Sequence, residues 1–323
     1  MKRAYVAKSF SDSALETIRI ANGIIDEYEV KGLSLTLRQL YYQFVARALV
    51  PNNDREYKRL GDVVGDARMA GLVDWSAIED RTRFLRTTPT WESPSEILST
   101  CAESFHIDPW AGSAERVEVW VEKDALVGVV EAACDPLDVP YFSCRGYTSM
   151  TAIYEAAQRI TRHLEAGRVV HVLHLGDHDP SGVDMSRDIE DRIKRLVTVD
   201  MEESGRFTSR DDVEDALCAG FDFERIALNR DQVTKYGPPP NPAKLTDSRA
   251  NGYVKLHGYE SWELDALEPT VLVKLIKDKV KQRIDPGSWY KAKKAEKAGR
   301  AILARAAETL AREESERKLA GKE

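Results

Sequence analysis

Two acidic residues, Asp177 and Asp179, directly follow the apolar run 169–175 and precede a helical pattern. Earlier in the chain, Glu122 directly follows another strand-like run, 117–121. Because the carboxyl ends of neighbouring parallel strands meet at one edge of a sheet, we expect the three acids to lie close together. Carboxylates in such proximity repel each other unless a cation neutralises them, and oxygen ligands suit Mg²⁺. The sequence therefore predicts a magnesium site formed by Glu122, Asp177 and Asp179.

Residues beside these acids could bind a phosphate. Lys123 follows Glu122 and can neutralise phosphate charge, while residues 180–182 open a helix whose free N–H groups attract anions. Glu122 could also act as a general acid or base. The alternative for the aspartates is a helix cap beside solvated acids. Metal-dependent phosphoryl chemistry is favoured by the whole pattern, in which the sequence GDxDPxG lies between a strand and a helix and Glu122 ends an upstream strand.

The elements that must position these residues alternate along the middle of the chain. Strand patterns are separated by helical patterns, and the strands cover 116–121, 139–144, 169–175 and 223–228. This alternation predicts an α/β fold with a mainly parallel four-stranded sheet flanked by helices.

Three helical patterns precede that region. They cover 11–29, a segment that starts at Ser34 or Thr36, and 56–72. The last carries Arg59 and Arg68 on its exposed face, which makes both candidates for DNA contacts. The pattern favours a helix-turn-helix or winged-helix module. Three helices can equally form a small core with no role in DNA binding.

Composition limits the class of protein. The chain has 323 residues, of which 42% are hydrophobic and 31% charged, and no apolar run reaches the ~20 residues of a membrane span. No secretion signal opens the chain, and its four cysteines are widely spaced, so we expect a cytoplasmic protein with reduced thiols. The net charge of −7 argues against nucleic-acid binding over the whole surface but allows local phosphate contacts.

These observations suggest a division into four parts. Residues 1–95 form a winged-helix-like DNA-binding domain, 96–115 a linker, 116–290 the α/β domain and 291–323 a charged C-terminal helix.

Several motifs resemble a known family. The Toprim fold of topoisomerases, primases and nucleases has motifs similar to residues 119–123 and 175–182. Within that fold, the A subunit of topoisomerase VI and its relative, the meiotic double-strand-break transesterase, also resemble this chain at residues 244–249 and 262–267. That family places a winged-helix domain before the Toprim domain. Its DNA-cleaving tyrosine lies in a motif like residues 37–42, which implies that Tyr42 is the nucleophile and Arg38 its phosphate-binding neighbour.

The resemblance implies a Mg²⁺-dependent transesterase that makes double-strand breaks in DNA as a homodimer, with a separate ATPase subunit where a full topoisomerase reaction occurs. The chain has no GxxxxGK phosphate loop of its own. Two alternatives remain open. In the first, the metal site hydrolyses DNA with water while Tyr41 and Tyr42 are structural. In the second, the chain binds DNA or assembles with a partner without catalysis.

Overall fold

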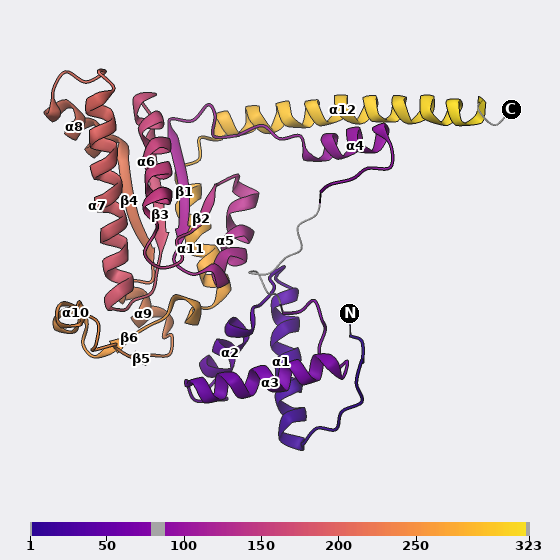
Figure 1. Ribbon diagram of the computed structural model, residues 1–323, viewed down its shortest axis with the longest axis vertical. Coiled ribbons are helices and arrows are strands. Elements are labelled where there is room, and N and C mark those ends of the chain that lie inside the picture. Colours follow the sequence, from indigo (N-terminus) through magenta and orange to yellow (C-terminus); the bar gives the residue numbers. More distant parts are fainter. Residues whose placement is uncertain (1, 79–87, 321–323) are drawn as a thin grey trace. The chain divides into compact units, whose positions relative to one another are not determined.

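The computed structural model describes residues 2–78 and 88–320 (Figure 1). The chain divides into two compact units. Residues 1–83 and 116–282 contribute to the first unit, and residues 84–115 and 283–323 contribute to the second.

The first unit begins with the three expected helices, α1 (Asp12–Glu29), α2 (Leu37–Ala46) and α3 (Asp54–Met69). Each begins with a side chain that satisfies a free backbone N–H: Ser11, Thr36 and Asn53 accept hydrogen bonds from Ala14, Gln39 and Glu56. Thr36 and Gln39 form a reciprocal capping box. Within residues 2–78, strand pairing is limited to isolated bridges, so the described N-terminal region is helical.

The apolar faces of these helices form one core. Its largest fully buried side chains include Ile24, Tyr28, Leu40 and Phe44, and Ala266 from much later in the chain joins them. Packing of α2 against the short helix η3 (Leu264–Ala266) therefore ties the N-terminal helices to the end of the α/β region.

The expected four-stranded parallel sheet is present. Its strand order is β2-β1-β3-β4, and the strands are β1 (Glu115–Val121), β2 (Tyr141–Ser143), β3 (Val169–Leu175) and β4 (Phe221–Ala227). In the register, Val119 lies opposite Tyr141 and Val172 opposite Phe223. The carboxyl ends of β1 and β3 meet where the backbone N–H of Glu122 donates to the carbonyl of Leu175 at 2.8 Å.

Helices cover both faces of the sheet (Figure 1). Helices α6 (Met150–Glu165) and α7 (Pro180–Glu203) pack together on one face, and α5 (Val127–Cys134) and α11 (Pro269–Lys281) on the other. The side chains buried under α6 and α7 include Trp120, and Figure 1 shows α8 (Arg210–Gly220) after α7. Two further short helices, η1 (Asp124–Leu126) and η2 (Asp135–Leu137), flank α5.

The segment after β4 returns to the carboxyl edge of the sheet. It contains α9 (Arg230–Tyr236), β5 (Asn241–Pro242), α10 (Ala250–His257) and β6 (Glu260–Ser261). Strands β5 and β6 pair in antiparallel orientation. The backbone of Trp262 then exchanges two hydrogen bonds with that of His178, at 2.8 and 2.9 Å. This pairing brings the residues that follow Trp262 beside Asp177 and Asp179.

The second unit consists mainly of two packed helices, α4 (Pro94–Ser104) and α12 (Pro286–Ala320). The Ser95 hydroxyl donates to Glu314 at 2.6 Å, and the backbone N–H of Ile107 donates to Glu296 at 3.2 Å. The expected charged C-terminal helix is thus present, although its predicted end at 321–323 lies outside the described residues. The expected domain boundaries stay predictions.

Glycine substitutions test the packing at the start of α7. A Cβ at Gly182 would lie 2.3 Å from the carbonyl oxygen of Asp177, whereas a Cβ at Gly65, inside α3, would meet nothing within 4 Å. We expect Gly182→Ala to lower the free energy of unfolding by about 1–3 kcal/mol. Gly65→Ala, the matched control, should raise it by about 0.5–1 kcal/mol through helix propensity. Urea unfolding of both variants measures the difference, and equal effects would contradict the packing described.

Candidate functional site

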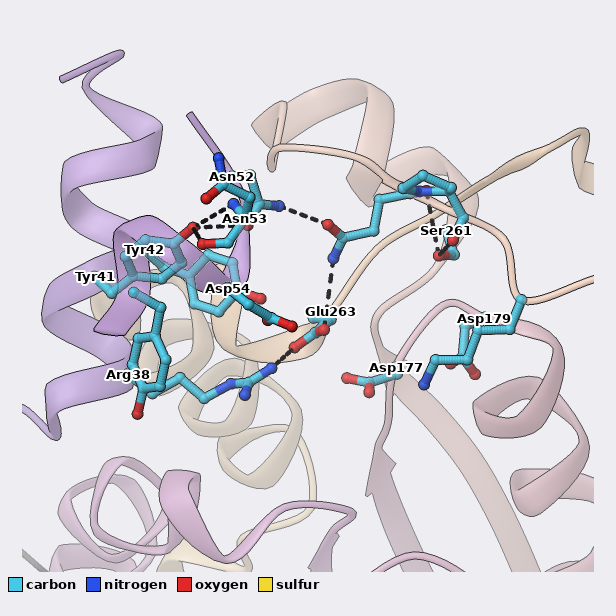
Figure 2. A pocket seen from close by; sticks show the side chains of 14 residues that line it. Arg38, Tyr41, Tyr42, Asn52, Asn53, Asp54, Asp177, Asp179, Ser261 and Glu263 are labelled. Atoms are coloured by element: carbon cyan, nitrogen blue, oxygen red, sulfur yellow. Dashed lines mark hydrogen bonds and ion pairs between the residues drawn. The ribbon is translucent and has the colours of Figure 1, made fainter. Parts of the chain in front are cut away.

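A pocket of about 280 Å³ joins the N-terminal helices to the carboxyl edge of the sheet (Figure 2). Its lining is strongly polar. The residues that line it are Arg38, Tyr41, Tyr42, Asn52, Asn53, Asp54, Tyr57, Asp177, Asp179, Asn241, Pro242, Lys244, Ser261 and Glu263. The predicted tyrosine motif and the predicted metal-binding aspartates therefore lie around one cavity within a single chain.

Helix α2 presents Arg38 and Tyr42 to this pocket. They lie four residues apart on one helix face, and the Arg38 guanidinium carbon is 5.6 Å from the centre of the Tyr42 ring. Tyr42 is only 3% exposed. Burial raises the pKa of its hydroxyl, and the carboxylates of Asp265 and Glu263 raise it further. In this conformation the Tyr42 hydroxyl is held in its neutral form.

The neighbouring Tyr41 has a different environment. Its hydroxyl accepts a hydrogen bond from the Asn53 N–H at 2.7 Å and lies 3.1 Å from the Asn53 carbonyl, to which it can donate. These bonds fix the turn that leads into α3. Of the two adjacent tyrosines, Tyr41 thus stabilises a turn, whereas Tyr42 adjoins the pocket's charged groups.

The three predicted metal ligands lie at the carboxyl edge of the sheet. The Asp177 N–H donates to Oε2 of Glu122 at 2.8 Å, which joins the ends of β1 and β3. Gly176 lies at this junction, where an added Cβ would be 2.9 Å from the same oxygen. Asp179 caps α7, accepting from the Gly182 N–H at 2.6 Å and from the Ser181 hydroxyl at 2.8 Å. Asp179 therefore caps the helix, as the alternative interpretation expected, and it uses one carboxylate oxygen, Oδ1, to do so.

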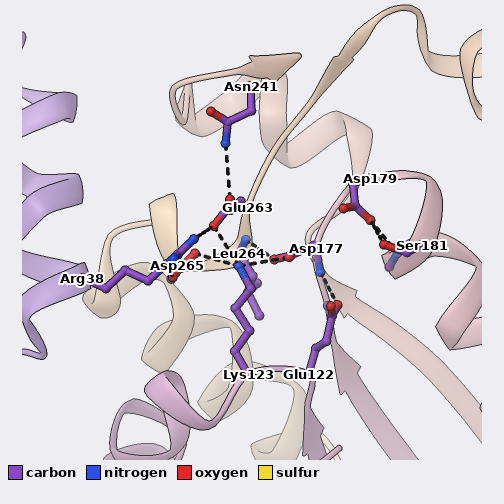
Figure 3. Close-up of polar contacts among 12 residues, drawn as sticks. Arg38, Glu122, Lys123, Asp177, Asp179, Ser181, Asn241, Glu263, Leu264 and Asp265 are labelled. Carbon is purple, nitrogen blue, oxygen red and sulfur yellow. Dashed lines mark hydrogen bonds and ion pairs between the residues drawn. The ribbon is translucent and has the colours of Figure 1, made fainter. Parts of the chain in front are cut away.

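Lys123 lies at the centre of a carboxylate cluster (Figure 3). Its ammonium nitrogen is 3.0 Å from one oxygen each of Asp177, Glu263 and Asp265. Arg38 reaches the same cluster, since its Nε lies 2.6 Å from Asp265 and its Nη2 pairs with Glu263. The backbone N–H of Leu264 also donates to Asp177 at 2.7 Å. Lys123 is thus held among acids rather than free in the pocket.

Sequence reasoning did not assign roles to Glu263 and Asp265. The available signal was their spacing: two acids separated by one residue, directly after a buried Trp262, repeat the pattern of Asp177 and Asp179. Residues 262–267 contributed to the family resemblance, but no charge pairing was expected from them.

Arg225 was also missed. This partly buried residue of β4 donates hydrogen bonds to the backbone carbonyls of Gly176 and Asp177, and to that of Gly182 at 3.0 Å. Its positive charge lies close behind the acids, and its hydrogen bonds hold the loop that carries them. An arginine within the otherwise largely apolar end of a predicted strand was the signal in the sequence.

The balance of charge in the site is negative. Five carboxylates, from Glu122, Asp177, Asp179, Glu263 and Asp265, face the three cations Arg38, Lys123 and Arg225. When all are ionised, the excess is two negative charges. This excess equals the charge of one divalent cation.

The pKa values of the acids reflect this crowding. Burial raises the pKa of Asp177 to about 7, because Lys123 only partly offsets burial and repulsion from Glu122 and Asp265. Burial likewise raises the pKa of Glu122. For Glu263, burial acts in the same direction, but Lys123 and Arg38 outweigh it and lower the pKa to about 2.

Two predicted DNA-binding residues lie outside the pocket lining. Arg59 pairs with Glu56 on the surface of α3 at 2.7 Å, and Arg68 stacks over Trp75 with its guanidinium carbon 4.8 Å from the ring centre. Glu122 and Lys123 do not line the cavity either, but both contact Asp177, which does. The structure therefore brings together Arg38, Tyr42, Glu122, Lys123, Asp177 and Asp179, and leaves Arg59 and Arg68 outside the pocket.

The donor set suits Mg²⁺ in chemistry and charge, since its ligands are carboxylate oxygens with a two-charge excess. Within residues 2–78 and 88–320, however, no three His, Cys, Asp or Glu side chains are already arranged to hold a metal ion. Glu122, Asp177 and Asp179 each use an oxygen in a hydrogen bond. Joint coordination thus requires the side chains to rearrange.

Comparison of the chain with protein-family models, with curated proteins and with solved structures finds no match.

No helix in the part of the chain that the structure describes has the length and apolar character that a membrane crossing requires.

The lowered pKa of Glu263 predicts a pH-dependent stability difference. Its stabilising charge is fully present above pH 4.5 and is lost as pH falls toward about 2, because the folded-state pKa lies below the unfolded value. We expect Glu263→Gln to lower the free energy of unfolding at neutral pH by about 1–2 kcal/mol, allowing for solvent screening of a side chain that is 28% exposed. Urea unfolding at a series of pH values measures this.

The difference between wild type and Glu263→Gln should shrink as pH falls below 4.5. Glu131→Gln, at an exposed position of α5, is the control and should match wild type throughout. A difference that stays constant or grows in acid would show that the lost charge is not its cause.

Proposed function

We propose that this chain is a Mg²⁺-dependent DNA-cleaving transesterase that resembles the A subunit of topoisomerase VI. The observation that carries the proposal is the shared pocket, in which Arg38 and Tyr42 of α2 lie opposite Asp177 and Asp179 (Figure 2). A winged-helix fold for the N-terminal helices and a Toprim fold for the α/β region belong to the same proposal.

In the proposed reaction, the Tyr42 oxygen attacks the phosphorus of a DNA phosphodiester. A bond forms between that oxygen and phosphorus, and the bond from phosphorus to the 3′ oxygen breaks. The hydroxyl proton of Tyr42 leaves, and a proton returns to the 3′ oxygen. The 5′ end of the DNA thus becomes attached to the protein.

Arg38 and Lys123 supply the positive charge that such a phosphate requires. A guanidinium can bind two phosphate oxygens at once, and a nearby ammonium adds a point charge. Both cations lie at the carboxylate cluster beside Tyr42. Their placement supports a role in orienting the phosphate and in stabilising charge in the transition state.

Glu122, Asp177 and Asp179 would hold the Mg²⁺. When bound, this ion would stabilise negative charge on the phosphate and on the departing 3′ oxygen. The excess of two negative charges supports this assignment, as does the pKa of Asp177, which burial and neighbouring carboxylates raise, because a bound divalent cation would offset both effects.

Double-stranded DNA, a homodimer and a separate ATPase subunit remain proposals that follow from the resemblance. A homodimer would provide one cleavage centre for each strand of a duplex. In the family, the tyrosine of one subunit meets the metal site of the other. Here Tyr42 and the two aspartates of one chain line the same pocket, so this conformation supports cleavage within a single chain equally well.

A second candidate is a nuclease that uses the same metal site but hydrolyses DNA with water. The burial of Tyr42 and the raised pKa of its hydroxyl favour it, because a neutral and enclosed phenol is a weak nucleophile. In this case Tyr42 would have a packing role.

Replacement of the two tyrosines separates the candidates. We expect wild-type protein, incubated with duplex DNA and Mg²⁺ and then denatured, to remain covalently attached to DNA 5′ ends. Tyr42→Phe should abolish this adduct and reduce cleavage by at least about 10³-fold, since the nucleophile is lost. Tyr41→Phe is the matched control and should retain cleavage, because its hydroxyl stabilises a turn.

Free 5′-phosphates made equally well by Tyr42→Phe would contradict the transesterase and support the water-dependent nuclease. DNA binding without cleavage in any divalent metal would contradict both and favour a non-catalytic DNA-binding protein. Asp177→Ala should abolish cleavage in either enzymatic case.

A further inference from the structure

One carboxylate oxygen is shared by Arg38, which lines the pocket, and by Lys123, which lies behind the lining. Oε2 of Glu263 lies 3.0 Å from Nζ of Lys123 and also pairs with Nη2 of Arg38 (Figure 3). The two cations come from segments far apart in the sequence, one on α2 and one after β1. Their convergence on a single anionic oxygen marks a position where negative charge is strongly favoured.

Glu263 differs from the other carboxylate that contacts both cations. Its side chain is 28% exposed and lines the pocket, whereas the Asp265 side chain has no exposed surface and does not line it. Asp265 bonds Arg38 at 2.6 Å and Lys123 at 3.0 Å. If Glu263 turned away, Asp265 would still hold the two cations in place.

Outside the pair of cations, the Glu263 carboxylate contacts the Tyr42 hydroxyl and the side chain of Asn241. Oε1 receives one long hydrogen bond, of 3.5 Å, from the side-chain amide of Asn241. The backbone on either side is fixed independently, by the pairing of Trp262 with His178 and by the bond from the Leu264 N–H to Asp177. The carboxylate can therefore move by side-chain rotation alone, without any displacement of the segment that carries it.

We propose that the position of Glu263 Oε2 is a binding subsite for a phosphate oxygen of DNA, and that the Glu263 carboxylate occupies this subsite until DNA replaces it. The inference rests on the proposed function for the identity of its ligand. A phosphate oxygen would take over the contacts to Arg38 and Lys123. Glu263 is thus a competitor for the substrate rather than a ligand of the metal ion.

Charge explains why this arrangement restrains binding. With Glu263 in place, three carboxylates, from Asp177, Glu263 and Asp265, surround the two cations Arg38 and Lys123, so an arriving phosphate meets an excess of one negative charge. Removal of the Glu263 carboxylate leaves two carboxylates for the two cations, which brings this balance to zero and removes the repulsion between Glu263 and the phosphate.

Inorganic phosphate and a short DNA duplex, both titrated without divalent metal at constant ionic strength, test the subsite. We expect Glu263→Ala to bind phosphate with a Kd about tenfold lower than wild type and to bind the duplex more tightly as well. Glu263→Gln, which keeps the size of the side chain, should change both affinities in the same direction.

Glu268→Ala is the matched control. Glu268 also connects the N-terminal helices to the later chain, through Tyr28 at 3.2 Å and Lys31 at 3.4 Å, but lies outside the pocket lining. Its removal changes the net charge equally and should leave phosphate affinity at the wild-type value. Phosphate binding no tighter in Glu263→Ala than in Glu268→Ala would overturn the inference.

The two ligands separate failure of the subsite from failure of the proposed function. Tighter phosphate binding without any DNA binding would support an anion subsite and contradict the proposed function. Wild-type DNA binding and cleavage, with no gain in affinity from Glu263→Ala, would contradict the inference alone. Loss of folding in both Glu263 variants but not in Glu268→Ala would also contradict it, because the carboxylate would then be part of the fold.

Discussion

The contact between the Lys123 ammonium and the carboxylates of Asp177, Glu263 and Asp265 underlies the organisation of the site. Carboxylates from separate segments would repel one another at this density, and burial of a lysine without acids would be equally costly. Burial acts to lower the pKa of Lys123, but the three acids reverse this and raise it. Together these groups join the end of β1, the end of β3 and the segment after β6.

Arg38 extends this cluster to the N-terminal helices. Through Asp265 and Glu263, it connects α2 to the carboxyl edge of the sheet, while packing of α2 against η3 buries the apolar surface beside it. The same arginine lies near Tyr42. Arg38 therefore contacts both the predicted nucleophile, Tyr42, and the carboxylates beside the predicted metal site. Binding of a metal ion or a phosphate at these carboxylates should thus also change the surroundings of Tyr42.

Much of the fold could be predicted because apolar periodicity is local. The strands, the helices between them and the placement of Glu122, Asp177 and Asp179 at strand ends follow from patterns within short windows. The roles of Glu263, Asp265 and Arg225 could not be predicted in this way. Their positions depend on long-range contacts, such as the pairing of His178 with Trp262, that no local pattern encodes.

In the proposed function, the carboxylates of this pocket support metal-dependent cleavage of DNA. The most direct measurement compares duplex cleavage by wild type and by Asp179→Asn, in Mg²⁺ and in excess EDTA. Asparagine is as good a helix cap as aspartate, so the variant should fold while its charge is lost. We expect cleavage only by wild type in Mg²⁺. Equal cleavage by both proteins, or cleavage that persists in EDTA, would contradict it.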